Sequence, residues 1–354
     1  MQDATARPAA TMRDVAHAAG VPLSAVSLVL NDRPGVSEQR REQVLRAVEE
    51  LRYAHRQRTP NRRKATVGLI MEALSPAAAK DGFMSEVVSG VEVGLRDHNM
   101  QMVLQLCRNG DDPVADLQDM LGRSVDGVIL ANGGDVDAAV VQRVLESGLP
   151  TVLLENYLLG DARSYSVVAD NFTAGYSATE HLLGLGHRRV AMVLGSTRYV
   201  SLRDRRHGYE AALLDAGLMP DTELMPPQRH GDALKGYRQT QQLLRLADPP
   251  TAIYAVSDKS AMGAYQAISE AGLKIPDDIS VVGTDDVEQA QMLNPPLSTF
   301  HIPTFDLGRT AARTLYSLLE HQELAPTRTT LLGWFVARGS SRSAGTPPPS
   351  SRRP

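Results

Sequence analysis

The sequence predicts two parts with different folds: a small all-α head of three helices and a larger α/β body built on parallel sheets. Residues 11–51 contain no strand-like segment, whereas from residue 66 short β-rich runs alternate with amphipathic helical stretches. That alternation is typical of parallel sheets with helices on both faces. Charge divides the chain at the same place: residues 1–66 hold 12 Lys and Arg against 7 Asp and Glu, and the remainder holds 25 against 34. A basic head favours a polyanionic partner, and a solvated basic surface is the alternative.

The head is predicted to hold three short helices separated by turn signals. Thr11 and Asp14 form a capping-box-like start, and Gly20 permits the left-handed conformation that ends the first helix. Pro22 suits the first turn of the second helix, and Ser37 is expected to cap the third. Apolar residues at helical spacing should form one small core: Val15, Ala16, Ala19, Val26, Leu30, Val44, Val48 and Leu51.

The body is predicted to contain nine strands, which fit two sheets better than one. The strand candidates are residues 66–71, 101–106, 127–130, 151–154, 166–168, 189–194, 252–256, 279–282 and 298–302. The helix candidates between them include residues 85–98, 174–185, 204–216, 260–271 and 305–321. The head (11–54) and the body (66–342) are joined by a linker, 55–65, that has nothing apolar to pack. We expect disorder in residues 1–10 and in the Pro/Ser/Arg-rich tail, 343–354.

Composition excludes several classes of protein. The single cysteine, Cys107, rules out an internal disulfide framework, fits a reducing compartment and is expected to be inert core. No apolar run approaches the ~20 residues that span a bilayer, and residues 1–10 lack the apolar segment of a secretory signal. We therefore expect a cytoplasmic protein without a membrane partner.

Residues 11–31 meet the demands of a helix-turn-helix, in which a short rigid corner lets the second helix enter the major groove of DNA. Ala16 and Ala19 are small enough for the helices to approach closely. Gly20 makes the turn and Val21 fills the corner, so the second helix is predicted to begin at about residue 23.

A series of short pieces, in unbroken order over residues 11–342, resembles the lac-repressor (LacI/GalR) family of transcription regulators. In chain order the pieces are Asp14-Val15-Ala16, Ala19-Gly20-Val21, Val26-Ser27, Val29-Leu30-Asn31, Val36-Ser37-Glu38, Glu50-Leu51-Arg52-Tyr53, Val125-Asp126-Gly127-Val128-Ile129-Leu130, Asp170-Asn171, Glu180-His181-Leu182, Leu185-Gly186-His187-Arg188-Arg189, Ile279-Ser280-Val281-Val282-Gly283-Thr284-Asp285-Asp286 and Pro295-Pro296-Leu297-Ser298-Thr299.

The resemblance implies a two-lobed body like a type I periplasmic binding protein, with the ligand in the cleft. Three crossovers near Val168, Thr299 and Thr330 would divide an N-lobe (about 66–168 and 299–329) from a C-lobe (about 169–298 and 330–342). In the family, two bodies pair as a homodimer and present two heads to a pseudo-palindromic operator in double-stranded DNA. Ligand binding changes lobe closure, and most members are repressors. No cofactor and no metal are implied.

Matching positions in the body nominate Arg205 and Asp285 as ligand contacts. A guanidinium and a carboxylate suit a carbohydrate, because together they bridge adjacent hydroxyls. Glu155 matches a position that is often aspartate in the family. The remaining candidates are Asp170 and Asp258, which open loops at strand ends, and the aromatic residues Phe83, Tyr157 and Phe172, which can stack on a sugar face. The alternative for each carboxylate is a helix N-cap, and for each aromatic ring it is core packing.

The positions that the resemblance assigns to DNA depart from the family pattern. Leu28 stands where an arginine normally grips guanine, and the linker lacks the leucine that wedges into the minor groove. Leucines can contact thymine methyls, or they can be core or silent. We expect weaker DNA bending, with linker arginines on the backbone or in the minor groove. The DNA-contact candidates are Thr11, Arg13, Leu23, Ser24, Ser27, Leu28, Asn31, Arg56 and Arg58.

The sequence also departs from the family around the cleft, and other function classes stay open. The loop after the first body strand is longer than usual, and Ser257 replaces a common asparagine, so the ligand is expected to differ from the family's commonest hexoses. An enzyme is disfavoured because the sequence lacks GxxxxGK(S/T), GxGxxG after the first strand, HExxH and a paired CxxC, and because the adjacent Asp285 and Asp286 should point to opposite faces. A secreted solute-binding protein would need a signal peptide and no head. A family member with degenerate operator binding is the remaining alternative.

Overall fold

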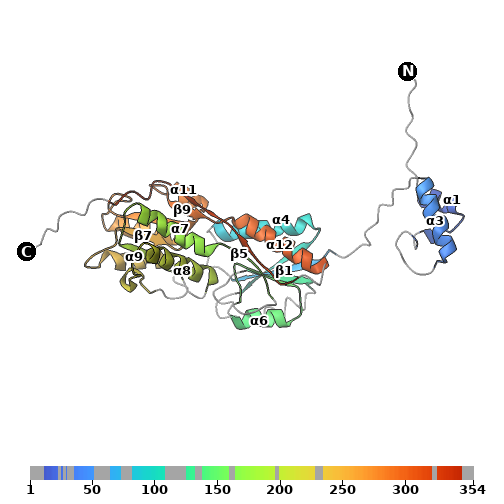
Figure 1. Cartoon of the computed structure of the whole chain (residues 1–354), viewed down its shortest axis with the longest axis horizontal. Helices are drawn as coiled ribbons and strands as arrows, with labels where there is room; N and C mark the ends of the chain where they lie inside the picture. The colour runs from blue at the N-terminus through green and yellow to red at the C-terminus, as the bar shows by residue number, and fades with distance from the viewer. Residues whose placement is uncertain are drawn as a thin grey trace, which may run out of the picture. The chain divides into compact units, whose positions relative to one another are not determined.

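In the computed structural model the chain forms two compact units, Met1–Arg63 and Lys64–Pro354, the head and the body (Figure 1). The described residues are 12–22, 25–26, 29, 36–51, 64–72, 82–107, 125–131, 138–158, 164–195, 199–227, 234–320 and 325–344.

The head contains helices α1 (Met12–Ala19) and α3 (Glu38–Glu50), and residues 25, 26 and 29 between them are helical. Gly20 ends α1 with a φ of 62°, as predicted. The adjacent Val21 is buried and donates its N–H to the Ala16 carbonyl oxygen, which closes the corner. Two expectations are wrong. Ser37 occupies the N-cap position of α3 without a capping hydrogen bond from its side chain, and Leu51 is exposed rather than core.

The first lobe of the body is a parallel sheet with helices on both faces. Its strand order is β10-β5-β4-β3-β1-β2. The strands are β1 (Thr66–Glu72), β2 (Gln101–Cys107), β3 (Gly127–Ala131), β4 (Thr151–Leu154), β5 (Tyr165–Ala169) and β10 (Arg328–Leu331). One face packs on α4 (Gly82–Asp97) and α12 (Thr304–Glu320), and the other on α6 (Ala138–Glu146). Burial on both faces explains why these strands read as continuous apolar runs.

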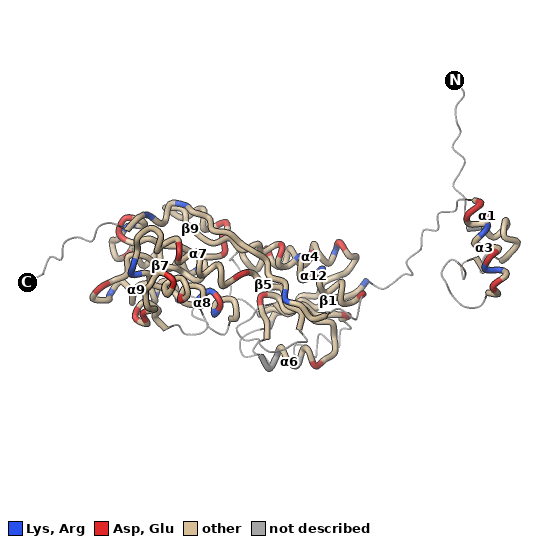
Figure 2. Tube along the Cα trace, viewed as in Figure 1, with Lys and Arg blue, Asp and Glu red and all other residues tan. Residues whose placement is uncertain are grey.

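The second lobe repeats this arrangement with the strand order β11-β9-β8-β7-β6. Its strands are β6 (Val190–Val193), β7 (Ala252–Ala255), β8 (Ser280–Asp285), β9 (Ser298–His301) and β11 (Trp334–Val336). Helices α7 (Asn171–Gly184) and α8 (Val200–Asp215) cover one face, and α9 (Lys235–Leu244) and α10 (Asp258–Glu270) cover the other. A short η1 (Thr222–Leu224) and α11 (Glu288–Met292) complete the lobe. Lys, Arg, Asp and Glu residues lie mainly outside the strands in the described part of the chain (Figure 2).

The chain crosses between the lobes three times. It leaves the first sheet after β5, returns to it after β9 to form α12, and crosses again between β10 and β11. The strands before the three crossings end at Ala169, His301 and Leu331, one or two residues past the predicted points. The strands β10 and β11 were not predicted, and β11 runs antiparallel to β9. Both are short edge strands, and β10 is polar and largely exposed, so it carries no apolar signal.

Residues 338–344 are tied to the second lobe around the buried His187. Its Nε2 lies 3.1 Å from the Arg342 carbonyl oxygen and 3.2 Å from Ser280 Oγ, and its Nδ1 lies 2.9 Å from Thr251 Oγ1. The carbonyl oxygen can only accept, so Nε2 carries the hydrogen, and a neutral Nδ1 then accepts from Thr251. Burial lowers the pKa of His187, and the Arg342 carbonyl partly offsets this effect.

Acidification is therefore expected to loosen the second lobe. Below its unfolded pKa, about 6.5, the unfolded chain binds a proton at His187 that the folded protein resists, so the free energy of unfolding falls as the pH drops. Urea unfolding at about pH 7.5 and about pH 5.5 should show a larger loss for the parent than for His187→Gln. The exposed His207→Gln serves as the matched control. Equal losses in the parent and His187→Gln would contradict the assignment.

None of the helices in the described part of the chain is long and apolar enough to cross a membrane. Cys107 ends β2, and its side chain lies outside the described features.

Candidate ligand-binding site

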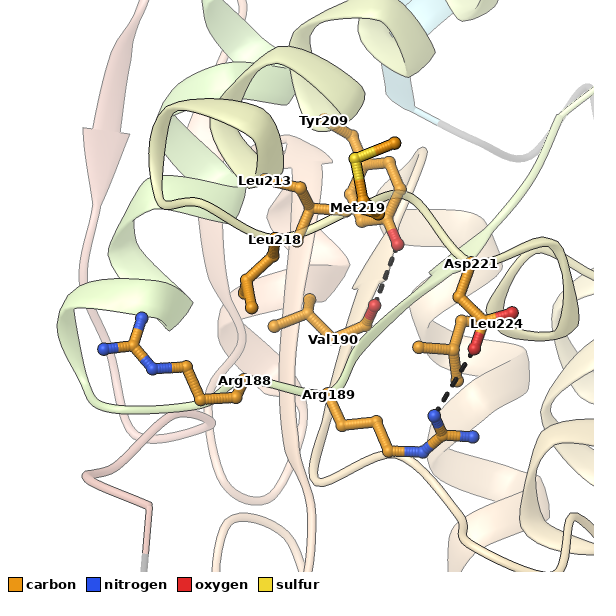
Figure 3. A pocket seen from close by; sticks show the side chains of 9 residues that line it. All are labelled: Arg188, Arg189, Val190, Tyr209, Leu213, Leu218, Met219, Asp221 and Leu224. Carbon is orange, nitrogen blue, oxygen red and sulfur yellow. Dashed lines mark hydrogen bonds and ion pairs between the residues drawn. The ribbon is translucent and has the colours of Figure 1, made fainter.

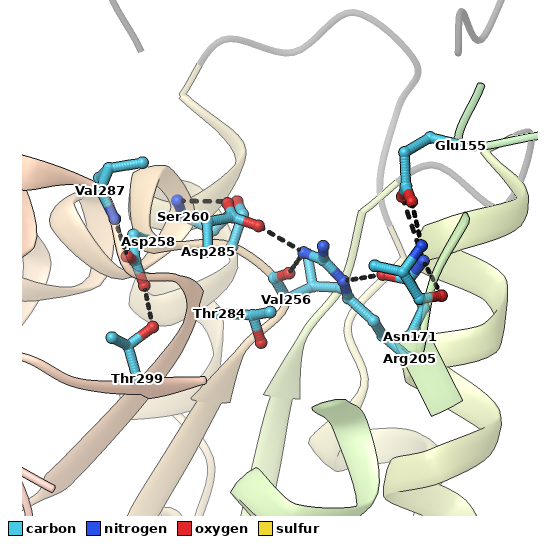
Figure 4. A network of polar contacts seen from close by, with 12 residues as sticks. Glu155, Asn171, Arg205, Val256, Asp258, Ser260, Thr284, Asp285, Val287 and Thr299 are labelled. Atoms are coloured by element: carbon cyan, nitrogen blue, oxygen red, sulfur yellow. Dashed lines mark hydrogen bonds and ion pairs between the residues drawn. The ribbon is translucent and has the colours of Figure 1, made fainter. Parts of the chain in front are cut away.

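A network of polar side chains centres on Arg205, in the first half of α8. The guanidinium is 3% exposed. Its Nε donates to Asn171 Oδ1 at 2.9 Å, and its Nη1 donates to the Val256 carbonyl oxygen at 2.7 Å and to Asp285 Oδ1 at 2.9 Å (Figure 4). Asn171 begins α7, and Val256 and Asp285 lie at the carboxyl ends of β7 and β8. The structure thus brings Arg205 and Asp285 together as predicted.

Glu155 extends the network into the first lobe. It directly follows β4, is buried, and accepts hydrogen bonds from the Ala169 N–H at 2.5 Å and from Asn171 Nδ2 at 3.1 Å. Burial raises the pKa of Glu155, while the Ala169 N–H and the Arg205 charge act in the opposite direction. Asn171 therefore joins Glu155 to Arg205 across the first crossing of the chain, which is where ligands bind in open α/β sheets.

Backbone strain is concentrated at this site. Four described non-glycine residues have a positive φ, and three of them lie here: Glu155 (55°), Asp285 (126°) and Asp286 (63°). Such conformations cost about 1–3 kcal/mol each and persist only where the surroundings fix them. Asp285 and Asp286 turn to different partners, as expected. Asp286 binds Arg338 Nη2 at 2.5 Å and His301 Nδ1 at 3.0 Å, so the two carboxylates do not form an acid/base pair.

The charge at the centre of the network is firmly held. Burial disfavours the charged guanidinium of Arg205, but Asp285 and Glu155 outweigh that effect and its pKa is raised. Asp285 is 11% exposed. Within the described residues Arg205 Nη2 has no hydrogen-bond acceptor. A permanently charged guanidinium beside a carboxylate can bind a ligand with hydroxyl groups, because a hydroxyl can accept from the guanidinium and donate to the carboxylate.

Two of the predicted carboxylates have structural roles instead. Asp170 is the N-cap of α7, and its Oδ1 accepts from the Thr173 N–H at 3.0 Å. Asp258 is fully buried and accepts from Thr299 Oγ1 at 2.6 Å and from the Val287 N–H at 3.0 Å. Burial and the nearby Asp285 raise the pKa of Asp258 to about 7. Since protein donors occupy both carboxylate oxygens of Asp258, a direct ligand contact is not supported.

The aromatic candidates fare differently from one another. Phe83 packs partly buried against the first-lobe core near the start of α4. Phe172 is 46% exposed and stacks with Tyr176. Tyr157 does not present a free ring, because the Arg328 guanidinium lies 3.6 Å from its centroid. Asn171, which bonds both Glu155 and Arg205, was not among the predicted contacts, although its place directly after the strand-end Asp170 was a usable signal.

A separate small cavity of about 130 Å³ lies at the opposite end of the second sheet (Figure 3). It is lined by Arg188, Arg189, Val190, Tyr209, Leu213, Leu218, Met219, Asp221 and Leu224. Arg189 is paired with Asp221 and Asp248, and Tyr209 Oη donates to the Val190 carbonyl oxygen. The cavity lies at the amino end of β6 and is not part of the Arg205 network.

The DNA-contact candidates lie almost entirely outside the described residues. Arg13 is in α1 without a described side chain, and Thr11, Leu23, Ser24, Ser27, Leu28, Asn31, Arg56 and Arg58 are not described. Among the described side chains, no cluster of three or more His, Cys, Asp and Glu residues could hold a metal ion.

Comparison with known proteins agrees with this architecture. Residues 11–55 match the family of bacterial regulatory proteins described as the lacI family, and residues 179–341 match the periplasmic binding protein-like domain. The ribose operon repressor of Haemophilus influenzae is 33% identical over 323 residues, which cover 88% of this chain and 92% of that repressor. The chain belongs to the lacI family of bacterial regulatory proteins.

Solved structures of lacI-family proteins resemble the chain over most of its length. The transcriptional regulator CelR in complex with cellobiose is 32% identical, with a TM-score of 0.73, over 95% of this chain and all of that one. A lac repressor dimer bound to operator and the anti-inducer ONPF is 27% identical, with a TM-score of 0.69, over 94% and 99%. The family resemblance and the fold class predicted from the sequence are confirmed.

Proposed function

We propose that this lacI-family protein is a sequence-specific DNA-binding repressor controlled by a carbohydrate bound between its two lobes. The observation that carries the proposal is the Arg205 network, which joins side chains at the carboxyl ends of strands from both sheets. Relatives over nearly the whole chain are named as repressors, and one similar structure holds cellobiose. The names of these relatives describe transcriptional repressors and not enzymes.

The chemistry of the network favours a polyol. Sugar hydroxyls both donate and accept, so one can accept from Arg205 while a neighbour donates to Asp285. We assign Arg205 and Asp285 to direct contact with the sugar, and Asn171 and Glu155 to holding the guanidinium in place. Closure of the lobes on the sugar would then change the arrangement of the two heads of a homodimer.

In the head, we propose that the second helix enters the major groove of a pseudo-palindromic operator. Ser27 and Asn31 would contact phosphates, and Leu23 and Leu28 would contact thymine methyls. Degenerate operator binding is the second candidate, and the observation that favours it is Leu28 at the position where an arginine would read guanine.

The test combines DNA binding with a sugar screen. The full-length protein should bind a duplex from upstream of its own gene far more tightly than a scrambled duplex of equal composition, and this affinity should fall steeply with salt. Ribose, cellobiose and other sugars are then screened by thermal shift and by the fluorescence of Trp334, which is the chain's single tryptophan and stacks on His301 beside a crossing. A true effector at 100 times its dissociation constant adds ~2.7 kcal/mol of stability.

The outcomes separate the candidates. Specific binding that one sugar changes supports the repressor. A sugar response with equal affinity for specific and scrambled duplexes indicates degenerate operator binding. A protein that responds to neither DNA nor any sugar would overturn both.

A further inference from the structure

Among the described residues outside the Arg205 network, the Tyr157 hydroxyl links the first lobe to α8 of the second through side-chain hydrogen bonds with Asp204 and with Arg203. Tyr157 lies beyond β4, in the first lobe, and its Oη donates to Asp204 of α8, in the second lobe. The distances to the two carboxylate oxygens are 2.8 Å and 3.0 Å. Tyr157 is half-buried, so this bond is partly shielded from water.

Tyr157 and Asp204 are each held by a different lobe, so they must separate if the lobes move apart. The Tyr157 ring lies under the guanidinium of Arg328, the first residue of β10, and this contact stays within the first lobe. Asp204 precedes Arg205, so the same turn of α8 carries the hydrogen bond to Tyr157 and the guanidinium of the proposed sugar site. A rotation that carries α8 away from the first lobe therefore breaks the bond between Tyr157 and Asp204.

We propose that Tyr157 and Asp204 form a latch between the lobes that stabilises their closed arrangement and so tunes the response to the effector. This inference rests on the proposed function for its regulatory meaning. The latch itself is a property of the ligand-free body. A phenol–carboxylate hydrogen bond is charge-assisted, which makes it stronger than one between neutral groups.

The chain offers a matched control. Tyr176 Oη donates to Asp215 Oδ2 at 3.0 Å, which is the same chemistry between α7 and α8 within the second lobe. Tyr157→Phe and Tyr176→Phe each delete one phenol–carboxylate bond without changing the ring. Only the first substitution is expected to change the relation between the lobes.

The test measures the separation of the lobes without any sugar or DNA. Spin labels are placed on Asp97→Cys and Met219→Cys, two exposed positions in different lobes, in the full-length protein carrying Cys107→Ala. In Tyr157→Phe the distance distribution should move to longer separations by more than about 2 Å or gain a longer component. Tyr176→Phe should match the parent.

Asp204→Ala, which removes the acceptor, should reproduce the Tyr157→Phe distribution, and the double variant should add nothing further, because both substitutions remove the same interaction. A Tyr157→Phe distribution identical to the parent would overturn the latch, as would an equal shift in Tyr176→Phe. Neither result would bear on whether the chain binds DNA or a sugar. If an effector is found, loss of the latch should weaken its binding by about threefold to tenfold.

Discussion

Replacing Arg205 with alanine is expected to abolish effector binding and to lower the free energy of unfolding by about 3–5 kcal/mol. The guanidinium is almost completely buried, and its removal deletes the ion pair with Asp285 and the hydrogen bond to Asn171 Oδ1. Breaking a buried ion pair from one side is costly, because the remaining charge stays desolvated. Urea unfolding measures the stability, and sugar titration measures the binding.

Two further variants separate the effects on stability and binding. Arg206→Ala removes the neighbouring arginine, whose partner Glu210 lies one helical turn away, and it should cost less than about 1 kcal/mol because that pair is partly exposed. Asp285→Asn keeps an acceptor for Arg205 but removes the carboxylate, and it should weaken sugar binding more than stability. If Arg205→Ala bound the sugar as tightly as the parent, the proposed site would be wrong.

Replacing Gly175 with alanine is the second substitution expected to have a large effect. A Cβ on Gly175 of α7 would lie 1.9 Å from the Arg205 carbonyl oxygen of α8, so the two helices must separate. We expect a loss of about 1–3 kcal/mol or more from overpacking, together with weaker sugar binding, because the atom displaced belongs to the central residue of the site.

Gly184 on the same helix is the matched control. A Cβ there meets nothing within 4 Å, so Gly184→Ala should be neutral or should stabilise by up to about 1 kcal/mol. Urea unfolding and sugar titration of both variants provide the measurement. If Gly175→Ala were as stable as Gly184→Ala, the prediction would be wrong, because α7 and α8 could then separate at little cost in free energy.

Much of the architecture was predictable from the sequence, because the physics that sets it is local or periodic. Strands that are buried on both faces read as short apolar runs, and the sequence located β4 at 151–154 without error. Gly20 and Val21 likewise indicated the corner of the head, because a positive φ and a small core residue were needed there. The edge strand β10 was missed because it is polar and exposed, and β11 was missed because its three residues are too few to show a period.

The candidate site shows where sequence reasoning ended. Asp170, Asp258 and Asp285 share one residue type and a similar place at strand ends, yet one caps a helix, one is buried under protein donors and one pairs with Arg205. The sequence allowed Tyr157 to stack on a sugar, but in the structure the Arg328 guanidinium covers one face of its ring. The sequence by itself determined the order of most elements and the division into head and body, because both follow from local and periodic patterns. The tertiary structure alone decided which carboxylate faces which donor, because partners such as Arg205 and Asp285 are 80 residues apart in the chain and meet only when α8 packs on the second sheet.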